Sequence, residues 1–323
     1  MTDKINISNL SEDSGSGKSV ITEKGEALSR NFFLKGKTIG ISISESDNLS
    51  ELGYSISHLN DAIIEVARYI ISLGGKLAYG GDMRPKGFTE LIFDLLVYYK
   101  ADKTLQPNER FYSYLAYPIS TTLSDQKEAE LIQNVSFKKI SPPSDIDVVE
   151  ANLLFEKSTP ENLYVWTRCL TKMREEMGNT CAARIFIGGA IRKFKGKCPG
   201  ILEELLIALE HKHPVYLVGA FGGITREAIE ALKGNQPVSF SNEVYFGNAD
   251  YKNMVAIYNE KHTENSIDFK KYLAALQSIG LKGIAEQNGL SEEDNLRLTI
   301  TPHISEVVYL ILKGLTHHFK NKQ

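Results

Sequence analysis

The chain has 323 residues, of which 42% are hydrophobic, and a formal net charge of −3. This length and composition support one large domain, or a domain with an extension, built around an ample hydrophobic core. The slightly acidic balance excludes a general attraction to nucleic acid or to an anionic membrane surface. No apolar run approaches the roughly 18 residues that a membrane-spanning helix needs.

The N-terminal segment, residues 1–34, is rich in Ser, Glu, Asp and Lys, which favours a disordered tail. Within it, residues 15–19 (GSGKS) resemble the end of a phosphate-binding P-loop. Glu12 stands where that motif requires its first glycine, and no strand precedes it, so we reject the motif. The segment has no signal-peptide hydrophobic stretch, and the three cysteines have no metal-ligand spacing. These features predict a cytoplasmic protein with reduced thiols and no metal.

Between residues 37 and 232, β-branched apolar runs alternate with stretches of helical periodicity. Strands are predicted at residues 37–44, 76–79, 110–117, 184–187 and 215–218. Helices are predicted at residues 59–73, 89–99, 124–133, 161–177, 199–210 and 225–232, and residues 118–160 are otherwise predicted to be irregular. This alternation indicates a Rossmann-like α/β domain over residues 35–238, with a parallel sheet covered by helices on both faces.

The alternation of strands and helices stops after Gly234. Residues 239–323 are predicted to form a mostly helical C-terminal extension, with helices near 268–279 and 305–318. A further helix is predicted to start at Ser291, because residues 291–294 (SEED) resemble a capping box. The sequence leaves two roles open for this extension: it joins copies of the chain, or it caps one edge of the sheet.

Four turns rich in glycine or serine follow predicted strands, at the edge where open parallel sheets bind ligands. Glycine lets backbone amides approach a ligand closely, so four such turns indicate an extended ligand of nucleotide size. Asp82 is expected either to contact a ribose hydroxyl or to cap the next helix. The candidate ligand-binding residues in these turns are Ser42, Ser44, Gly80, Gly81, Asp82, Gly188, Gly189, Gly200, Gly222 and Gly223.

Basic residues lie in the same turns. Arg84, Arg192 and Lys193 are predicted to contact phosphate, since arginine binds it through two parallel hydrogen bonds and lysine supplies a point charge. For Lys195 and Lys197, exposure for solubility explains the sequence equally well. We expect Arg84 and Arg192 to face one shared cleft, and the hypothesis would fail if they lay on opposite sides of the molecule with no cleft between them.

The predicted helix at 199–210 opens with Gly200 and carries Glu203 and Glu204. A helix N-terminus attracts phosphate, whereas two carboxylates repel it, so a ligand with both phosphate and ribose is indicated. Adjacent helical side chains point about 100° apart, so one glutamate should face the site and the other should be solvated or paired with a base. Arg174, on the preceding helix, is expected to keep a carboxylate ionised. Such a pair either orients sugar hydroxyls or assists cleavage of an N-glycosidic bond.

These residues resemble the SLOG superfamily, which groups Smf/DprA proteins with LOG (Lonely Guy) enzymes. The LOG hallmark is a PGGxGTxxE motif that follows a helix carrying an arginine. Gly188, Gly189, Gly200 and Glu204 match its glycines and its glutamate, and Arg174 has the place of its arginine. The resemblance covers residues 37–235.

The chain departs from the LOG motif at three points. Ile187 replaces the proline, Ile201 replaces the threonine, and residues 190–199 stand where LOG has a single residue. The long basic insert is more similar to the ligand-sensing branches of the superfamily, the LSDAT-type domains of prokaryotic proteins and TRPM channels and the ligand domain of Thoeris effectors.

Resemblance to the sensing branches implies binding of a nucleotide-derived ligand such as ADP-ribose, in a bacterial stress or antiviral defence pathway. It also implies a homo-oligomer, a separate effector protein as partner and no cofactor. Resemblance to LOG implies instead a phosphoribohydrolase that releases a base from a nucleotide, with Glu204 as the catalytic carboxylate and Arg174 as its orienter. A third interpretation, an Smf-like binder of single-stranded DNA, is disfavoured by the acidic balance.

Overall fold

The computed structural model describes residues 32–320 except 82, 85, 99–108 and 157. The predicted tail up to residue 31, with its P-loop-like segment, and Asp82 therefore lie outside the described residues. The described residues from Phe32 onward belong to one compact unit. Leu34, which the sequence analysis placed in the tail, is fully buried and packs in the core.

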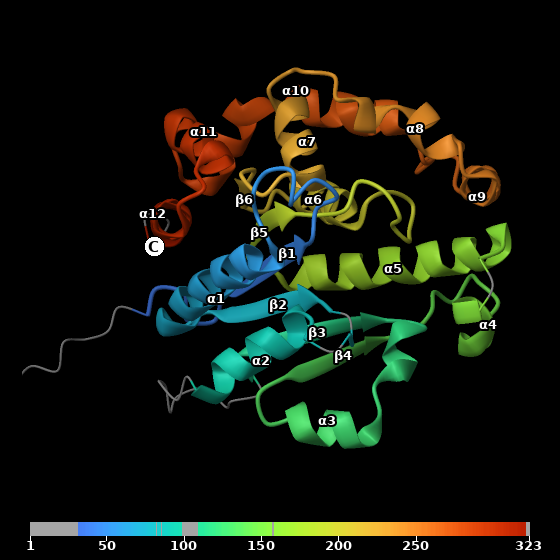
Figure 1. The fold of residues 1–323 in the computed structure, drawn as a ribbon, viewed down its shortest axis with the longest axis horizontal. Coiled ribbons are helices and arrows are strands. Elements are labelled where there is room, and N and C mark those ends of the chain that lie inside the picture. Colours follow the sequence, from blue (N-terminus) through green and yellow to red (C-terminus); the bar gives the residue numbers. More distant parts are fainter. Residues whose placement is uncertain (1–31, 82, 85, 99–108, 157, 321–323) are drawn as a thin grey trace, which may run out of the picture. The chain divides into compact units, whose positions relative to one another are not determined.

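The centre of the fold is a parallel sheet of six strands in the order β4-β3-β2-β1-β5-β6 (Figure 1). The chain runs outward from β1 to β4 and then returns to pair β5 with β1 on its other side, so the topological switch point lies between β1 and β5. The strands are β1 (Thr38–Ser44), β2 (Lys76–Gly80), β3 (Phe111–Ala116), β4 (Ser136–Ile140), β5 (Ala183–Gly188) and β6 (Val215–Val218).

Helices cover both faces of the sheet, as predicted. On one face lie α1 (Ile56–Ser72), α2 (Phe88–Tyr98) and α12 (Ile304–Lys320). On the other lie α5 (Pro160–Thr180), α6 (Gly200–Glu210) and α7 (Gly223–Leu232). The other short helices before α5 in the described part of the chain are η2 (Ile119–Thr122), α3 (Asp125–Leu131) and α4 (Ala151–Glu156).

Strand β5 shows how alternation builds the site. Ile185 and Ile187 point into the core shared with α1, whereas Phe186 packs in the core shared with α6. Arg184 shares the side of Phe186, and its guanidinium carbon lies 5.4 Å from the centroid of that ring. A charged side chain is thus placed between the sheet and the helices α5 and α6.

The predicted irregular structure of residues 136–140 is wrong, because β4 occupies them. This strand lies at the edge of the sheet and its two lysines are exposed, so it lacks the apolar run of a buried parallel strand.

Helices of the C-terminal extension pack against strand β6 and against α1, α5 and α7. It contains η3 (Val238–Phe240), α8 (Asn242–Phe246), α9 (Ala249–Lys261), α10 (Phe269–Asn288), α11 (Glu292–Ile300) and α12. Tyr216 donates its hydroxyl to the carbonyl of Asn288 at 2.8 Å, and the Asn288 amide donates to the carbonyl of Val215 at 2.9 Å. These bonds satisfy polar groups of the edge strand, which matches the edge-capping role left open by the sequence.

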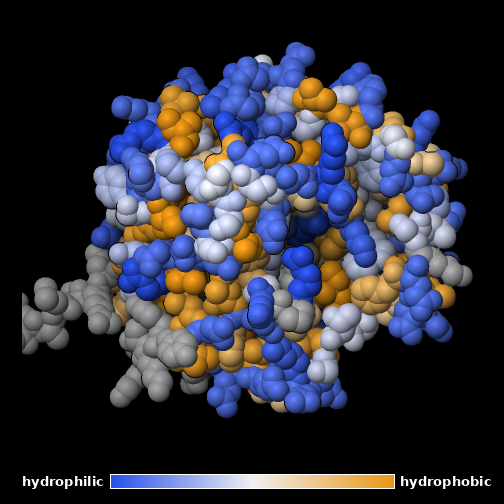
Figure 2. Space-filling view, viewed as in Figure 1, coloured by the Kyte–Doolittle hydropathy of each residue, from blue (hydrophilic) through white to orange (hydrophobic). Residues whose placement is uncertain are grey.

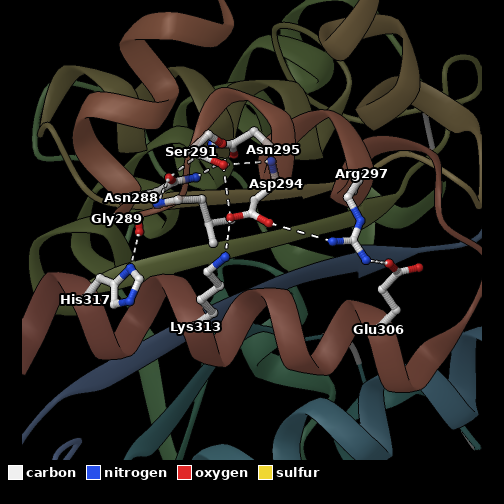
Figure 3. A network of polar contacts seen from close by, with 10 residues as sticks. Asn288, Gly289, Ser291, Asp294, Asn295, Arg297, Glu306, Lys313 and His317 are labelled. Carbon is white, nitrogen blue, oxygen red and sulfur yellow. Dashed lines mark hydrogen bonds and ion pairs between the residues drawn. The ribbon is translucent and has the colours of Figure 1, made fainter.

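A polar network joins α11 to α12 (Figure 3). Ser291 caps α11 by accepting a hydrogen bond from the amide of Asp294 at 3.0 Å, which confirms the predicted helix start. Lys313 Nζ lies 2.6 Å from Asp294 Oδ2, and Arg297 pairs with Glu306. Charged pairs therefore hold α11 and α12 together. Apolar packing holds the extension to the sheet.

None of the helices in the described part of the chain is long and apolar enough to span a lipid bilayer.

Candidate functional site

A pocket of about 740 Å³ opens at the carboxyl ends of β1 and β2, beside the switch point. We call it the main pocket. Its volume is typical of small-molecule sites, and Figure 2 shows the molecule hollowed on this face between hydrophilic and hydrophobic surface. Of the predicted site residues, those lining it are Ser42, Ser44, Gly80, Arg84, Arg174, Lys193, Gly200 and Glu204.

Glu204 lies in the main pocket and is fixed from the sheet side. Ser42 Oγ donates to Glu204 Oε2 at 2.6 Å, and Arg184 Nη2 pairs with the same oxygen. Arg184 Nη2 is also 2.6 Å from Ser42 Oγ, which closes a three-residue network. Glu204 Oε1 receives no hydrogen bond from the described residues. It lies 3.8 Å from Arg174 Nε and close to Gly80 at the end of β2.

Arg184 is fully buried and is not among the site residues predicted from the sequence. The signal was present, because this arginine interrupts an otherwise apolar buried strand, and charged residues are almost never fully buried unless they are paired. Space for its side chain comes from Gly40 in β1, where an added Cβ would lie 2.4 Å from Arg184 Cδ. Arg184, rather than Arg174, is therefore the arginine that hydrogen-bonds Glu204.

Replacing Gly40 with alanine is expected to destabilise the fold by about 1–3 kcal/mol, the usual cost of overpacking a filled core. The matched control is Gly247→Ala, because a Cβ there would meet no described heavy atom within 4 Å. Urea unfolding followed by circular dichroism measures the stability of both variants. Equal midpoints for Gly40→Ala and the unmodified protein would show that Arg184 does not need this space.

Glu203 lies behind Glu204 and is fully buried outside the lining of the main pocket. Arg174 Nη1 donates to Glu203 Oε2, Thr171 Oγ1 donates to Oε1 at 2.6 Å, and Lys197 Nζ lies 3.5 Å from Oε1. Burial alone would raise the pKa of Glu203, but the charges of Arg174 and Lys197 and these hydrogen bonds lower it below its usual value. One glutamate thus lines the pocket while the other pairs with a base.

Gly200 makes the position of Arg174 possible. A Cβ at Gly200 would lie 2.7 Å from Arg174 Nη2, so only glycine lets the guanidinium cross the start of α6. This arrangement brings the first amides of α6 and the charge of Arg174 to the same wall of the main pocket.

The other predicted glycines lie outside the lining of the main pocket. Gly81 packs against the hydroxyl of Ser113. Gly189 donates its amide to Ser44 O at 2.8 Å and accepts the amide of Ile224 at 2.9 Å, so it fastens the turns that follow β1, β5 and β6. The glycines of these fastened turns are Gly188, Gly189, Gly222 and Gly223.

The prediction that Arg84 and Arg192 share a cleft is wrong. Arg84 lines the main pocket, whereas Arg192 lines a separate pocket of about 490 Å³ that also contains Asp47 and Glu227. The reason is local, because Asp47 Oδ2 accepts the amides of Ile191 and Arg192 at 2.8 and 2.9 Å. These bonds hold that part of the loop beside the turn after β1, on the side of the second pocket.

The basic loop, residues 189–199, is anchored by the C-terminal extension. The Phe194 ring lies 5.4 Å from the ring of Tyr245 and 5.6 Å from that of Tyr251, measured between centroids. Tyr251 also donates its hydroxyl to the carbonyl of Lys197 at 2.6 Å. The extension therefore supports the loop that brings Lys193 to the main pocket.

The sequence profile of the family SLOG cluster2 matches residues 33–298, most of the chain. The chain belongs to the SLOG cluster2 family. This confirms the resemblance stated from the glycine turns and Glu204, and it agrees with the parallel α/β sheet. The match extends into α11, so the SLOG region includes much of the C-terminal extension.

One solved structure similar to this SLOG protein is the X-ray structure of TM1055, a target of the Northeast Structural Genomics Consortium. The two are 16% identical, and the match covers 63% of this chain and 84% of that chain with a TM-score of 0.35. No curated protein matches the chain significantly.

Proposed function

We propose that this SLOG protein binds a nucleotide-derived ligand of the ADP-ribose class in the main pocket and acts as its sensor. The observation that carries the proposal is Glu204, whose Oε2 is held by Ser42 and Arg184 while Oε1 is left for a ligand. A carboxylate fixed in this way accepts hydrogen bonds from neighbouring ribose hydroxyls without first reorganising.

The same pocket offers positive groups for phosphate. Arg84 and Lys193 line it, and α6 begins at Gly200 on its wall. The first amides of a helix have no acceptor within the helix, and the helix dipole favours an anion there. A ligand with ribose near Glu204 and phosphate near these groups uses both kinds of charge, which resolves the conflict seen in the sequence.

Two alternatives share this geometry. As a sensor, the protein keeps the ligand intact and signals to a separate effector, as a homo-oligomer in a bacterial stress or antiviral defence pathway. As an N-glycosidase, it uses Glu204 to stabilise the positive charge that develops on the sugar, with Arg174 Nε 3.8 Å away as a second charged group. The sensor is favoured because Ile187, Ile201 and the long basic loop depart from the LOG catalytic motif.

A thermal unfolding screen with nucleotides and nucleotide sugars tests the proposal. A ligand at a hundredfold excess over its dissociation constant is expected to stabilise the protein by about 2.7 kcal/mol. Chromatography of the same mixtures then separates the two alternatives, because a sensor returns the ligand unchanged and an N-glycosidase releases free base. If Glu204→Gln abolished base release by the purified protein, the enzyme would be favoured over the sensor. Absence of both stabilisation and turnover across the panel would reject both alternatives.

A further inference from the structure

One end of the main pocket is aromatic, and the proposed ribose and phosphate contacts leave it unused. We define the aromatic end by Ile119, Thr122, Phe155, Trp166 and Leu170, all of which line the pocket. The rings of Phe155 and Trp166 meet edge to face with centroids 5.6 Å apart. Phe155 is 44% exposed, so it has apolar surface in the main pocket that a ligand can cover.

The basic loop places a cation on this aromatic end. Lys195 Nζ lies 4.0 Å from the centroid of the Trp166 ring and 6.0 Å from that of Phe155. Burial lowers the pKa of Lys195 below its usual value. An ammonium group over a tryptophan ring is held by the electrostatics of the ring face, and it attracts the face of any further aromatic ring in the same way.

We propose that the aromatic end is a subsite for the planar base of the ligand, and that it recognises the face of the base rather than its edge. The inference rests on the proposed function, since it assigns the base of the same nucleotide. Its carrying observation is that, among the five residues that define this end, both side-chain donors already have an acceptor within the protein. Trp166 Nε1 donates to the carbonyl of Leu154 at 3.0 Å, and Thr122 Oγ1 donates to that of Ile119 at 2.8 Å.

Recognition by the face has a definite consequence for specificity. Every base has a π-face, so stacking tolerates different bases, whereas hydrogen bonds to the edge distinguish them. Adenine and guanine nucleotides should therefore bind with similar affinity. A ribose phosphate without a base should bind roughly tenfold to a hundredfold more weakly, the range that base–aromatic stacking supports.

Trp166 is the only tryptophan of the chain, so its fluorescence reports on this subsite directly. The probes are AMP, GMP and ribose 5-phosphate, with affinities measured by calorimetry on the full chain. AMP and GMP should change the emission saturably and bind within about threefold of each other. Phe155→Leu should weaken the binding of AMP and leave the affinity for ribose 5-phosphate unchanged. The matched control is Tyr309→Leu, which should change neither affinity. Tyr309 is an aromatic residue of α12 that is 56% exposed.

The outcomes separate this inference from the proposed function. Equal affinity for AMP and ribose 5-phosphate, or an unchanged ratio of the two in Phe155→Leu, would overturn the base subsite while the proposed function stands. A thirtyfold preference between AMP and GMP would overturn recognition by the face. If no probe binds although ADP-ribose does, the subsite is wrong; if ADP-ribose and the whole nucleotide panel also fail, the proposed function falls with it.

Discussion

Replacing Arg184 with methionine is expected to lower the free energy of unfolding by about 3–5 kcal/mol and to abolish ligand binding. Arg184 is fully buried and pairs with Glu204 Oε2. Methionine fills similar space but leaves the carboxylate in a poorly solvated place with only the hydroxyl of Ser42 as a donor to Oε2. Urea unfolding measures the stability, and calorimetry with the strongest compound of the nucleotide panel measures the binding.

Two further variants show whether charge is the cause. The double variant Arg184→Met/Glu204→Gln removes both charges. Its loss of stability should therefore be smaller than the sum of the losses in the two single variants. Arg68→Met breaks a pair with Glu65 in which both side chains are about 40% exposed, and it should change stability by less than about 1 kcal/mol. An Arg184→Met protein that unfolds at the original urea concentration and still binds ligand would refute the role given to Arg184.

Replacing Glu203 with glutamine is expected to cost about 3–5 kcal/mol at pH 7, because it removes the carboxylate that accepts a hydrogen bond from the buried guanidinium of Arg174. The cost should shrink in acid. The pKa of folded Glu203 lies below its ordinary value of 4.5, so its stabilising contribution is complete above pH 4.5 and is lost as the pH falls through the folded pKa. Below that pH the unmodified protein also carries a neutral group at this position.

Urea unfolding at several pH values between 7 and 3 measures this difference. The curves of free energy against pH for the unmodified protein and Glu203→Gln should converge in acid. The matched control is Glu260→Gln at an exposed position of α9, whose curve should run parallel to that of the unmodified protein. Parallel curves for Glu203→Gln as well would contradict the pairing of Glu203 with Arg174.

The central sheet could be predicted from sequence because its buried strands are continuous apolar runs. Strand β1 reads TIGISIS and β6 reads VYLV, and no other element of that length explains such runs between helical segments. Strand β4 could not be predicted in this way. Its SFKKI sequence is that of a partly exposed edge strand, and it lies in a stretch without regular periodicity.

The candidate site could be predicted where it is local and was missed where it is not. Glu204 and Gly200 belong to one turn and helix, and both line the main pocket as expected. The partner of Glu204 was missed because a sequence does not show which face of β5 carries Arg184, or that Gly40 in the neighbouring strand leaves space for it. Arg192 was assigned to the wrong pocket because an irregular loop has no sequence periodicity that shows which way its side chains point.

The aromatic end could not be predicted for a different reason. Trp166 lies in a long helix, where a single aromatic residue normally indicates core packing. Phe155 belongs to α4, within a stretch that was predicted to be irregular. Their approach depends on the packing of α4 against α5, which no local pattern in the sequence specifies.

Calorimetry on one variant of Arg192 and one variant of its neighbour Lys193 tests the location of the ligand most directly. Lys193 and Arg192 are both exposed cations of the basic loop, but Lys193 lines the main pocket and Arg192 lines the other one. With the strongest compound of the nucleotide panel, Lys193→Gln should weaken binding about tenfold, as expected for a lost charged hydrogen bond. Arg192→Gln should leave the affinity within about twofold. The reverse result, with Arg192→Gln weakening binding and Lys193→Gln neutral, would move the ligand out of the main pocket and contradict the account.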